Sequence, residues 1–182
     1  KSSPPAAKPV TTPKVLVSDD FTSAKPEHWE ILKGDWKFST KGVRQHEIGS
    51  GRRALRLKPV TPADFEASLS FTIRGGQKWK SVGIAFDSAD GDDVMVYMSA
   101  VSGGSKIQVA IGNDGKSSYP PTGSVARPIS QDVRYTLDLR VRGQLINASI
   151  NDEPVLAYRL PQSRHQGGLA LTAFDADVEF HS

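Results

Sequence analysis

The sequence predicts an all-β protein, a two-sheet antiparallel jelly-roll sandwich with a disordered Pro-rich leader at its N-terminus. Two observations support this prediction. From residue 15 onward, apolar and polar residues alternate with a period of two, and turn-forming residues separate the alternating runs. A domain of this size buries roughly 70% of its unfolded surface. We therefore expect a leader over residues 1–14 and a single β-sandwich domain over residues 15–182.

The first fourteen residues have the composition of a linker. They hold four of the twelve prolines and almost no side chain that a core could bury. Such a segment behaves as an extended tether. Because the chain begins with Lys1 rather than Met, we expect it to be processed or truncated, with any export signal already removed. The expected location is secreted, periplasmic or cell-surface, with the leader tethering the domain to a larger protein.

The alternating runs indicate the strands in chain order. In the clearest run, residues 64–74, Phe65, Leu69 and Ile73 share one face with other apolar residues. Further runs cover residues 82–86, 94–98, 107–111, 135–141 and 146–150. The turns between runs are marked by Asp90-Gly91, Gly103-Gly104, Asn113-Asp114-Gly115 and Asn151-Asp152. We expect about a dozen short strands, no helix, and one long irregular stretch over residues 116–132.

Charge argues against a nucleic-acid partner. The formal net charge is +3, but three of the 23 Lys and Arg residues lie in the leader, which contains no acid. The domain therefore has 20 basic and 20 acidic residues. Nucleic-acid binding usually requires a basic face, because phosphate neutralisation dominates its affinity. We also expect no transmembrane segment, since no apolar run approaches the ~20 residues that cross a bilayer.

The common catalytic motifs are absent from the sequence. The chain has no cysteine, no Gly-x-Ser-x-Gly elbow, and four histidines without the spacing of a zinc site. Jelly-roll glucanases place their carboxyls on one strand as Glu-x-Asp-x-x-Glu, because a glycosidase needs two carboxyls beside the scissile bond. Here Glu66 is followed on its strand face by Ser68 and Ser70. We therefore predict no catalytic residues.

Acidic residues near one predicted turn are the candidate metal ligands. Asp87, Asp90 and Asp92 surround Gly91, with Asp93 beside them, and carboxylate oxygens suit calcium. Their spacing is not that of an EF-hand, so a solvated turn is the favoured interpretation. The predicted function requires no cofactor, with Ca²⁺ at this turn as an alternative. Acidic pairs near the two ends of the domain are a second calcium alternative: Asp19/Asp20 and Asp175/Asp177.

Several short motifs resemble those of a known superfamily. They are Asp19-Asp20-Phe21, Trp29, Gly34-Asp35-Trp36-Lys37-Phe38, Val82-Gly83-Ile84-Ala85-Phe86-Asp87 and Gly167-Gly168-Leu169-Ala170-Leu171. They resemble the concanavalin A-like lectin/glucanase superfamily, particularly its bacterial laminin G-like and 3-keto-disaccharide hydrolase-type (DUF1080-like) group. The resemblance runs from about Val15 to the end of the chain. It rests on structural glycines and core aromatics, so it implies the fold rather than an activity.

The solvent face of the predicted meander over residues 64–111 is the candidate ligand site. Pairing the hairpins about their turns places Ser70 and Thr72 beside Ala85 and Gly83, then Tyr97, then Gln108. Small residues would leave a trough in which Tyr97 stacks against a sugar, and Trp79 would lie over one end. Arg74, Asp87 and Gln108 are expected at its border. Trp29 and Trp36 are expected in the core instead.

A second candidate is a basic set on the strands before residue 64. It comprises Arg44, His46 and Arg56, with Arg52 and Arg53 between them. Arginine side chains bind carboxylates with two parallel hydrogen bonds, so this set suits acidic sugars.

The sequence favours an exported, non-catalytic carbohydrate-binding module whose partner is a glycan or polysaccharide. The first alternative is a glycoside hydrolase acting on oxidised (3-keto) sugars. It would use Asp87, Glu66 or His46 as acid or base. The second alternative is a protein-interaction or assembly domain, a role in which laminin G-like sandwiches also serve.

Overall fold

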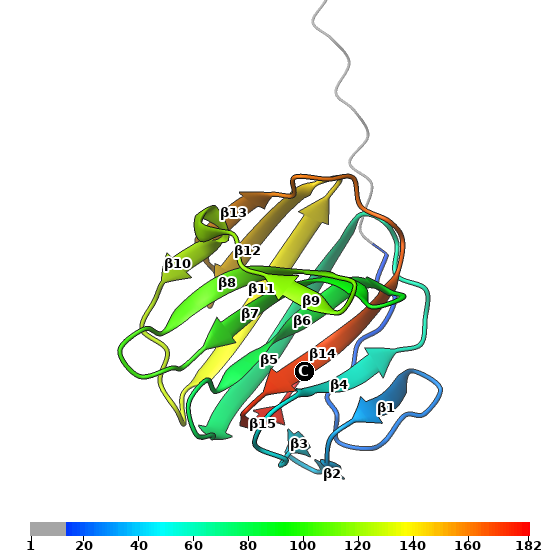
Figure 1. The fold of residues 1–182 in the computed structure, drawn as a ribbon. Helices are drawn as coiled ribbons and strands as arrows, with labels where there is room; N and C mark the ends of the chain where they lie inside the picture. Colours follow the sequence, from blue (N-terminus) through cyan, green and yellow to red (C-terminus); the bar gives the residue numbers. More distant parts are fainter. Residues whose placement is uncertain (1–13) are drawn as a thin grey trace, which may run out of the picture.

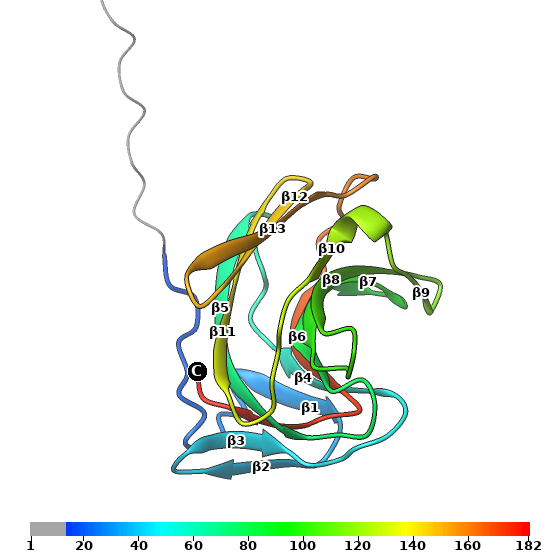
Figure 2. The same ribbon diagram turned by 90° about the vertical axis from the view of Figure 1, so that its left-hand side faces the viewer.

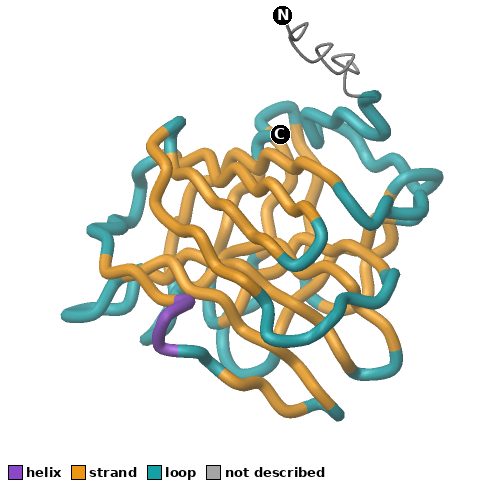
Figure 3. Tube along the Cα trace, turned by 90° about the horizontal axis from the view of Figure 1, so that it is seen from above, coloured by secondary structure: helices purple, strands orange, loops and turns teal. Residues whose placement is uncertain are grey.

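The computed structural model describes residues 14–182, so the predicted leader lies outside it except for Lys14. This part of the chain forms fifteen strands and one three-residue 3-10 helix, η1 (Pro121–Gly123). Every strand pairing is antiparallel, and the strands form two sheets that lie face to face (Figures 1 and 2). Figure 3 shows how strands dominate the described chain. The prediction of an all-β jelly-roll sandwich is confirmed.

The first sheet, called sheet A, has eight strands. Their order is β1-β4-β14-β6-β7-β8-β10, and β9 also pairs with β8. The bounds are β1 (Trp29–Lys33), β4 (Arg52–Leu57), β14 (Gly168–Phe174), β6 (Ser81–Ala89), β7 (Asp92–Ser99), β8 (Lys106–Asn113), β9 (Lys116–Ser118) and β10 (Ser124–Ala126). β14, from near the end of the chain, is inserted between β4 and β6, so residues far apart in sequence share this sheet (Figure 1).

The second sheet, called sheet B, has seven strands in the order β13-β12-β11-β5-β15-β3-β2. The bounds are β13 (Glu153–Arg159), β12 (Leu145–Ile150), β11 (Arg134–Arg142), β5 (Phe65–Gly75), β15 (Asp177–Phe180), β3 (Gly42–Gln45) and β2 (Trp36–Ser39). β15, the last strand, lies between β5 and β3. In both sheets a C-terminal strand therefore joins the N-terminal strands to the rest.

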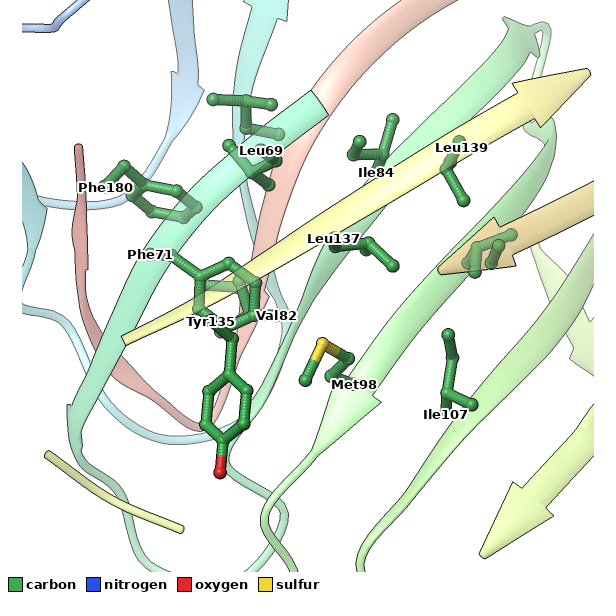
Figure 4. Packing of buried hydrophobic residues seen from close by; sticks show 14 of the residues in the cluster. Leu69, Phe71, Val82, Ile84, Met98, Ile107, Tyr135, Leu137, Leu139 and Phe180 are labelled. Atoms are coloured by element: carbon green, nitrogen blue, oxygen red, sulfur yellow. The ribbon is translucent and has the colours of Figure 1, made fainter. Parts of the chain in front are cut away.

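The core lies between the inner faces of the two sheets. Phe71 and Leu137 of sheet B and Ile84 and Met98 of sheet A are fully buried in it (Figure 4). Alternation with a period of two brings these residues to one face of each strand. Trp29 and Trp36 also belong to this cluster, at 9% and 7% exposure, as predicted.

The predicted pairing of β5 with β6 is wrong. β5 lies in sheet B and pairs with β11 and β15, whereas β6 pairs with β14 and β7 in sheet A. The connection between β5 and β6 crosses from one sheet to the other, with a left-handed conformation at Lys80 (φ 44°). Ser70 and Thr72 consequently lie on the outer face of sheet B. The alternation of apolar and polar residues shows which residues face the core. It is the same whether two successive strands form a hairpin or lie in different sheets, so it does not show which strands pair.

Residues 116–132 are more regular than predicted. β9 and β10 pair with the two ends of β8, on the edge that β7 leaves open, and η1 separates them. The individual strands have only three residues each, too few to show alternation in the sequence. This segment positions Tyr119, which follows β9, beside the outer face of sheet A.

Candidate functional site

A groove of about 630 Å³ crosses the outer face of sheet A. Its lining comes from six neighbouring strands and two loops: Arg52 (β4), Thr172 and Phe174 (β14), Ser81 and Val82 (β6), Met95 and Tyr97 (β7), Lys106 and Gln108 (β8), Ser117 (β9), Trp79 and Tyr119. The groove therefore runs across the strands rather than along them. Figure 2 shows β9 projecting from sheet A on the side away from sheet B.

The floor of the groove brings together residues of β6, β7 and β8 that the sequence analysis placed as neighbours on one face. Tyr97 is paired with Gly83 on one side and with Gln108 on the other. The Tyr97 hydroxyl donates a 2.7 Å hydrogen bond to Oε1 of Gln108. A Cβ atom on Gly83 would lie 2.2 Å from the carbonyl oxygen of Val96, so only glycine permits this close approach of β6 to β7.

Tyr97 is less accessible than an open platform would be. It is only 9% exposed, whereas Trp79 and Tyr119 are 43% and 54% exposed. The exposed aromatic surface of the groove therefore comes from Trp79 and Tyr119. The role of Tyr97 in stacking stays a prediction. Tyr119 was missed because it lies in the stretch that the sequence analysis assigned to an irregular loop.

The pH dependence of stability tests the burial of Tyr97. Burial, with a smaller contribution from Tyr119, raises the pKa of Tyr97 to about 12. Because the unfolded value is about 10, the protonated group stabilises the fold below pH ~10, and this contribution is lost as the pH rises toward ~12. Relative to Tyr97→Phe, the wild type should lose about 2–3 kcal/mol over this window. Urea unfolding of both proteins checks this, and parallel pH profiles would contradict it.

The loop before β6 is held in place by Asp175, a buried residue between β14 and β15. Its carboxylate accepts hydrogen bonds from the amides of Gln77 (3.3 Å), Lys78 (2.7 Å) and Trp79 (2.9 Å). Burial alone would raise the pKa of Asp175, but the backbone hydrogen bonds outweigh it and the pKa is lowered. Asp175, which the sequence analysis considered only for calcium, therefore positions the backbone of Trp79.

Trp79 has further contacts that orient its part of the loop, among them a 3.3 Å hydrogen bond from the Ser81 hydroxyl to its carbonyl oxygen. Ser99 on β7 donates a 2.5 Å hydrogen bond to the Trp79 carbonyl oxygen, and the ammonium of Lys78 lies 4.7 Å from the centre of the indole ring. The loop is thus attached to the sheet through its backbone. This leaves a large part of the indole surface exposed beside the groove.

Arg52 and Asp93 form an ion pair across the outer face of sheet A. Arg52 is on β4 and Asp93 on β7, and two strands, β14 and β6, lie between them. A side-chain contact over two intervening strands requires small residues beneath it, and β6 supplies Gly83 and Ala85 there. The pair therefore bounds the groove on the side of β4.

Arg74 does not border the groove. It is on β5 in sheet B, where it pairs with Asp132 and Glu179. The physical reason is the crossing between sheets after β5, which moves residues 70–74 to the opposite side of the sandwich. The sequence prediction of Arg74 beside Tyr97 is wrong for this reason.

Asp87 is also away from the groove. Its side chain is 6% exposed and accepts two hydrogen bonds from Arg164, 2.7 Å from Nε and 2.9 Å from Nη2. Asp92 accepts a hydrogen bond from the amide of Asp114. Residues 14–182 contain no group of three His, Asp or Glu side chains arranged to hold a metal ion. The structure therefore does not bring Asp87, Asp90 and Asp92 together as a ligand set.

The predicted basic set is divided between the two sheets. Arg44 on β3 in sheet B pairs with Asp177, and Arg56 on β4 in sheet A pairs with Glu30. His46 follows β3 and so stays with sheet B. The loop between β3 and β4 crosses between the sheets, which separates residues that are close in the sequence. Of these candidates and their neighbours, only Arg52 lines the groove.

No family model matches the chain, and neither does any curated relative. Solved structures do match. The carbohydrate-binding module CBM66 from Bacillus subtilis has a TM-score of 0.74 at 17% identity, covering 85% of this chain and 92% of its own. A Bacillus licheniformis β-glucanase has a TM-score of 0.67 at 8% identity, covering 89% and 93%. A Bacillus subtilis protein of unknown function with a galectin-like fold has a TM-score of 0.68 at 11% identity, covering 89% and 91%. The chain thus has the concanavalin A-like jelly-roll fold.

Proposed function

We propose that the chain binds carbohydrate in the groove of sheet A and does not cleave it. The observation that supports this most directly is the pairing of two exposed aromatic rings, Trp79 and Tyr119, with a polar floor. The axial C–H groups of a sugar pack against an aromatic ring, and its hydroxyls hydrogen-bond to planar amides and to hydroxyl groups. Gln108, Ser81 and Thr172 supply such groups along the groove.

The lining of the groove favours binding over hydrolysis. A glycosidase requires two carboxyl groups beside the scissile bond. Among residues 14–182, the side chains that line this groove include two cations and no carboxylate. Of the three acid or base candidates of the 3-keto-glycosidase alternative, Glu66 and Asp87 pair with arginines outside the groove, and His46 follows β3 and is not among the residues that line it. The neighbouring Asp93 is neutralised by Arg52.

The structural neighbours are consistent with this proposal and include both binding proteins and enzymes. CBM66 is a carbohydrate-binding module, one neighbour has a galectin-like fold, and another is a β-glucanase. Residues 14–182 contain no helix with the length and apolar character needed to cross a membrane. An exported location fits a polysaccharide ligand and is part of the proposal. Tethering through residues 1–14 rests on composition alone.

Removing either exposed ring should weaken glycan binding. We expect Trp79→Ala and Tyr119→Ala each to raise Kd about tenfold, because an aromatic contact contributes roughly 1–1.5 kcal/mol. Glycan arrays and polysaccharide pulldowns, with calcium and with chelator, identify the ligand, and calorimetry measures the change in Kd.

Leu145→Ala is the matched control, since Leu145 is 40% exposed but lies on β12 in sheet B. It should bind as the wild type does. Unchanged affinity in both aromatic variants would remove the site assignment. A protein that binds no glycan, but forms a dimer burying this groove, would favour the assembly alternative.

A further inference from the structure

The charges in the groove point to one class of carbohydrate. We propose that the ligand is a polysaccharide with an anionic group on its sugar units, a uronic carboxylate or a sulfate ester, and that Lys106 binds this group. The inference rests on the proposed function, because it specifies the ligand of the same groove.

Within residues 14–182, the ammonium group of Lys106 forms no ion pair, and the lining of the groove contains no Asp or Glu. No Asp or Glu oxygen within residues 14–182 lies within 4 Å of its ammonium nitrogen. Its side chain lines the groove and is only partly accessible to solvent. A cation in a partly enclosed, acid-free groove interacts more strongly with an anion than one in open water does.

Most arginines in the described chain are neutralised by carboxylates. Arg44 pairs with Asp177, Arg164 with Asp87, and Arg74 with Glu179. These pairs join strands or loops that are distant in sequence, so their role is accounted for within the fold. Lys106 has no such role. Its charge is therefore available to a ligand.

Lys106 lines the same groove as the exposed indole of Trp79. On β8 it faces the same side as Gln108, and its partner on β7 is Ser99. Ser99 in turn bonds to the carbonyl oxygen of Trp79. A sugar ring stacked on Trp79 would thus lie near a polar amide and an ammonium group at the same end of the groove.

The second cation of the groove lies in the same cross-strand row. Successive Cα partners lead from Arg52 through Phe174, Ser81 and Ser99 to Lys106. Four steps between strands correspond to a Cα separation of about 19 Å in a flat sheet. Only Nη1 of Arg52 donates to Asp93, so its other N–H groups remain for a ligand. Two cations that line one groove suit a chain that carries repeated negative charges.

Paired polymers that differ only in charge test the inference. The probes are polygalacturonate and its carboxyl-reduced form, and dextran sulfate and dextran. We expect the wild type to bind a charged polymer at least about tenfold more tightly than its neutral counterpart, and this preference to shrink between ~0.02 M and ~0.2 M salt. The two pairs distinguish a carboxylate from a sulfate.

Lys106→Met keeps the apolar stem and removes the charge. It should lower affinity for the charged polymer about tenfold and leave affinity for the neutral polymer unchanged. Lys116→Met, on the exposed surface of β9 outside the groove lining, is the control and should bind as the wild type does.

Two results would overturn the inference alone. They are equal affinity of the wild type for charged and neutral polymers, and an unchanged preference for charge in Lys106→Met. Either would leave glycan binding in place. A protein that binds neither these polymers nor any glycan on an array would overturn the proposed function together with the inference.

Discussion

Arg164→Ala is expected to lower the free energy of unfolding by about 3–5 kcal/mol, because it leaves the buried Asp87 carboxylate without its partner. The two side chains are 9% and 6% exposed and form two parallel hydrogen bonds. The guanidinium also donates to the carbonyl oxygens of Ala63 and Gly143, and it lies 5.3 Å from the centre of the Phe86 ring. Arg164 lies in the loop between β13 and β14. Its side chain thus links this loop, the loop between β4 and β5 and the turn between β11 and β12 to Asp87 on β6.

Urea denaturation of Arg164→Ala measures this loss. The control is Arg140→Ala, since the Arg140–Glu66 pair is exposed and should contribute only about 0–1 kcal/mol. The double variant Asp87→Asn/Arg164→Met removes both charges and keeps at position 87 a residue that tolerates its left-handed conformation (φ 53°), so it should recover part of the stability. Equal destabilisation by the Arg164 and Arg140 variants would contradict the assignment of a buried structural pair.

Asp175→Asn should loosen the loop that carries Trp79. Because Trp79 lines the groove, the same substitution should also weaken glycan binding. The substitution removes the charge from an acceptor of three amide hydrogen bonds, which should lower stability by about 1.5–3 kcal/mol. Asparagine is the appropriate replacement because Asp175 has φ of 51°, a left-handed conformation that asparagine tolerates better than alanine does. Hydrogen exchange should show faster exchange of the amides of residues 77–79.

Lowering the pH should also loosen the loop at residues 77–79 in the wild-type protein. The pKa of Asp175 is lowered in the folded state, so its stabilisation is complete above the unfolded value of ~4 and is lost as the pH falls through the folded value. Asp152→Asn is the control, since Asp152 is an exposed turn residue with φ of 65°. Unchanged protection of these amides in Asp175→Asn, or unchanged glycan affinity, would show that the loop does not depend on this carboxylate.

The elements of the fold that depend on short stretches of sequence were predictable. Alternation identified the inward faces of β5, β6, β7 and β8, and Asp90-Gly91 and Gly103-Gly104 marked the turns between β6, β7 and β8. The hairpins joining β6, β7 and β8 then determined the row of Gly83, Tyr97 and Gln108. Three of the predicted ligand residues, Tyr97, Trp79 and Gln108, do line one groove for this reason.

The remaining features depend on the order of strands in the two sheets. Nothing in the local pattern distinguishes a hairpin from a crossing between sheets, so Arg74 was expected near Tyr97 although β5 belongs to sheet B. The same limit applies to Phe174 and Arg52, which reach the groove because β14 is inserted between β4 and β6.

By itself, the sequence determined the all-β sandwich, its core and the order of strands in the β6–β8 meander, because these follow from alternation and turn chemistry within a few residues. Tertiary structure alone decided which charges are neutralised and which face the groove. Arg164 and Asp87 are 77 residues apart, and Arg44 and Asp177 are 133 apart. Contacts of this kind are set by how the strands are ordered when the two sheets bury their apolar faces, an arrangement that short-range patterns do not encode.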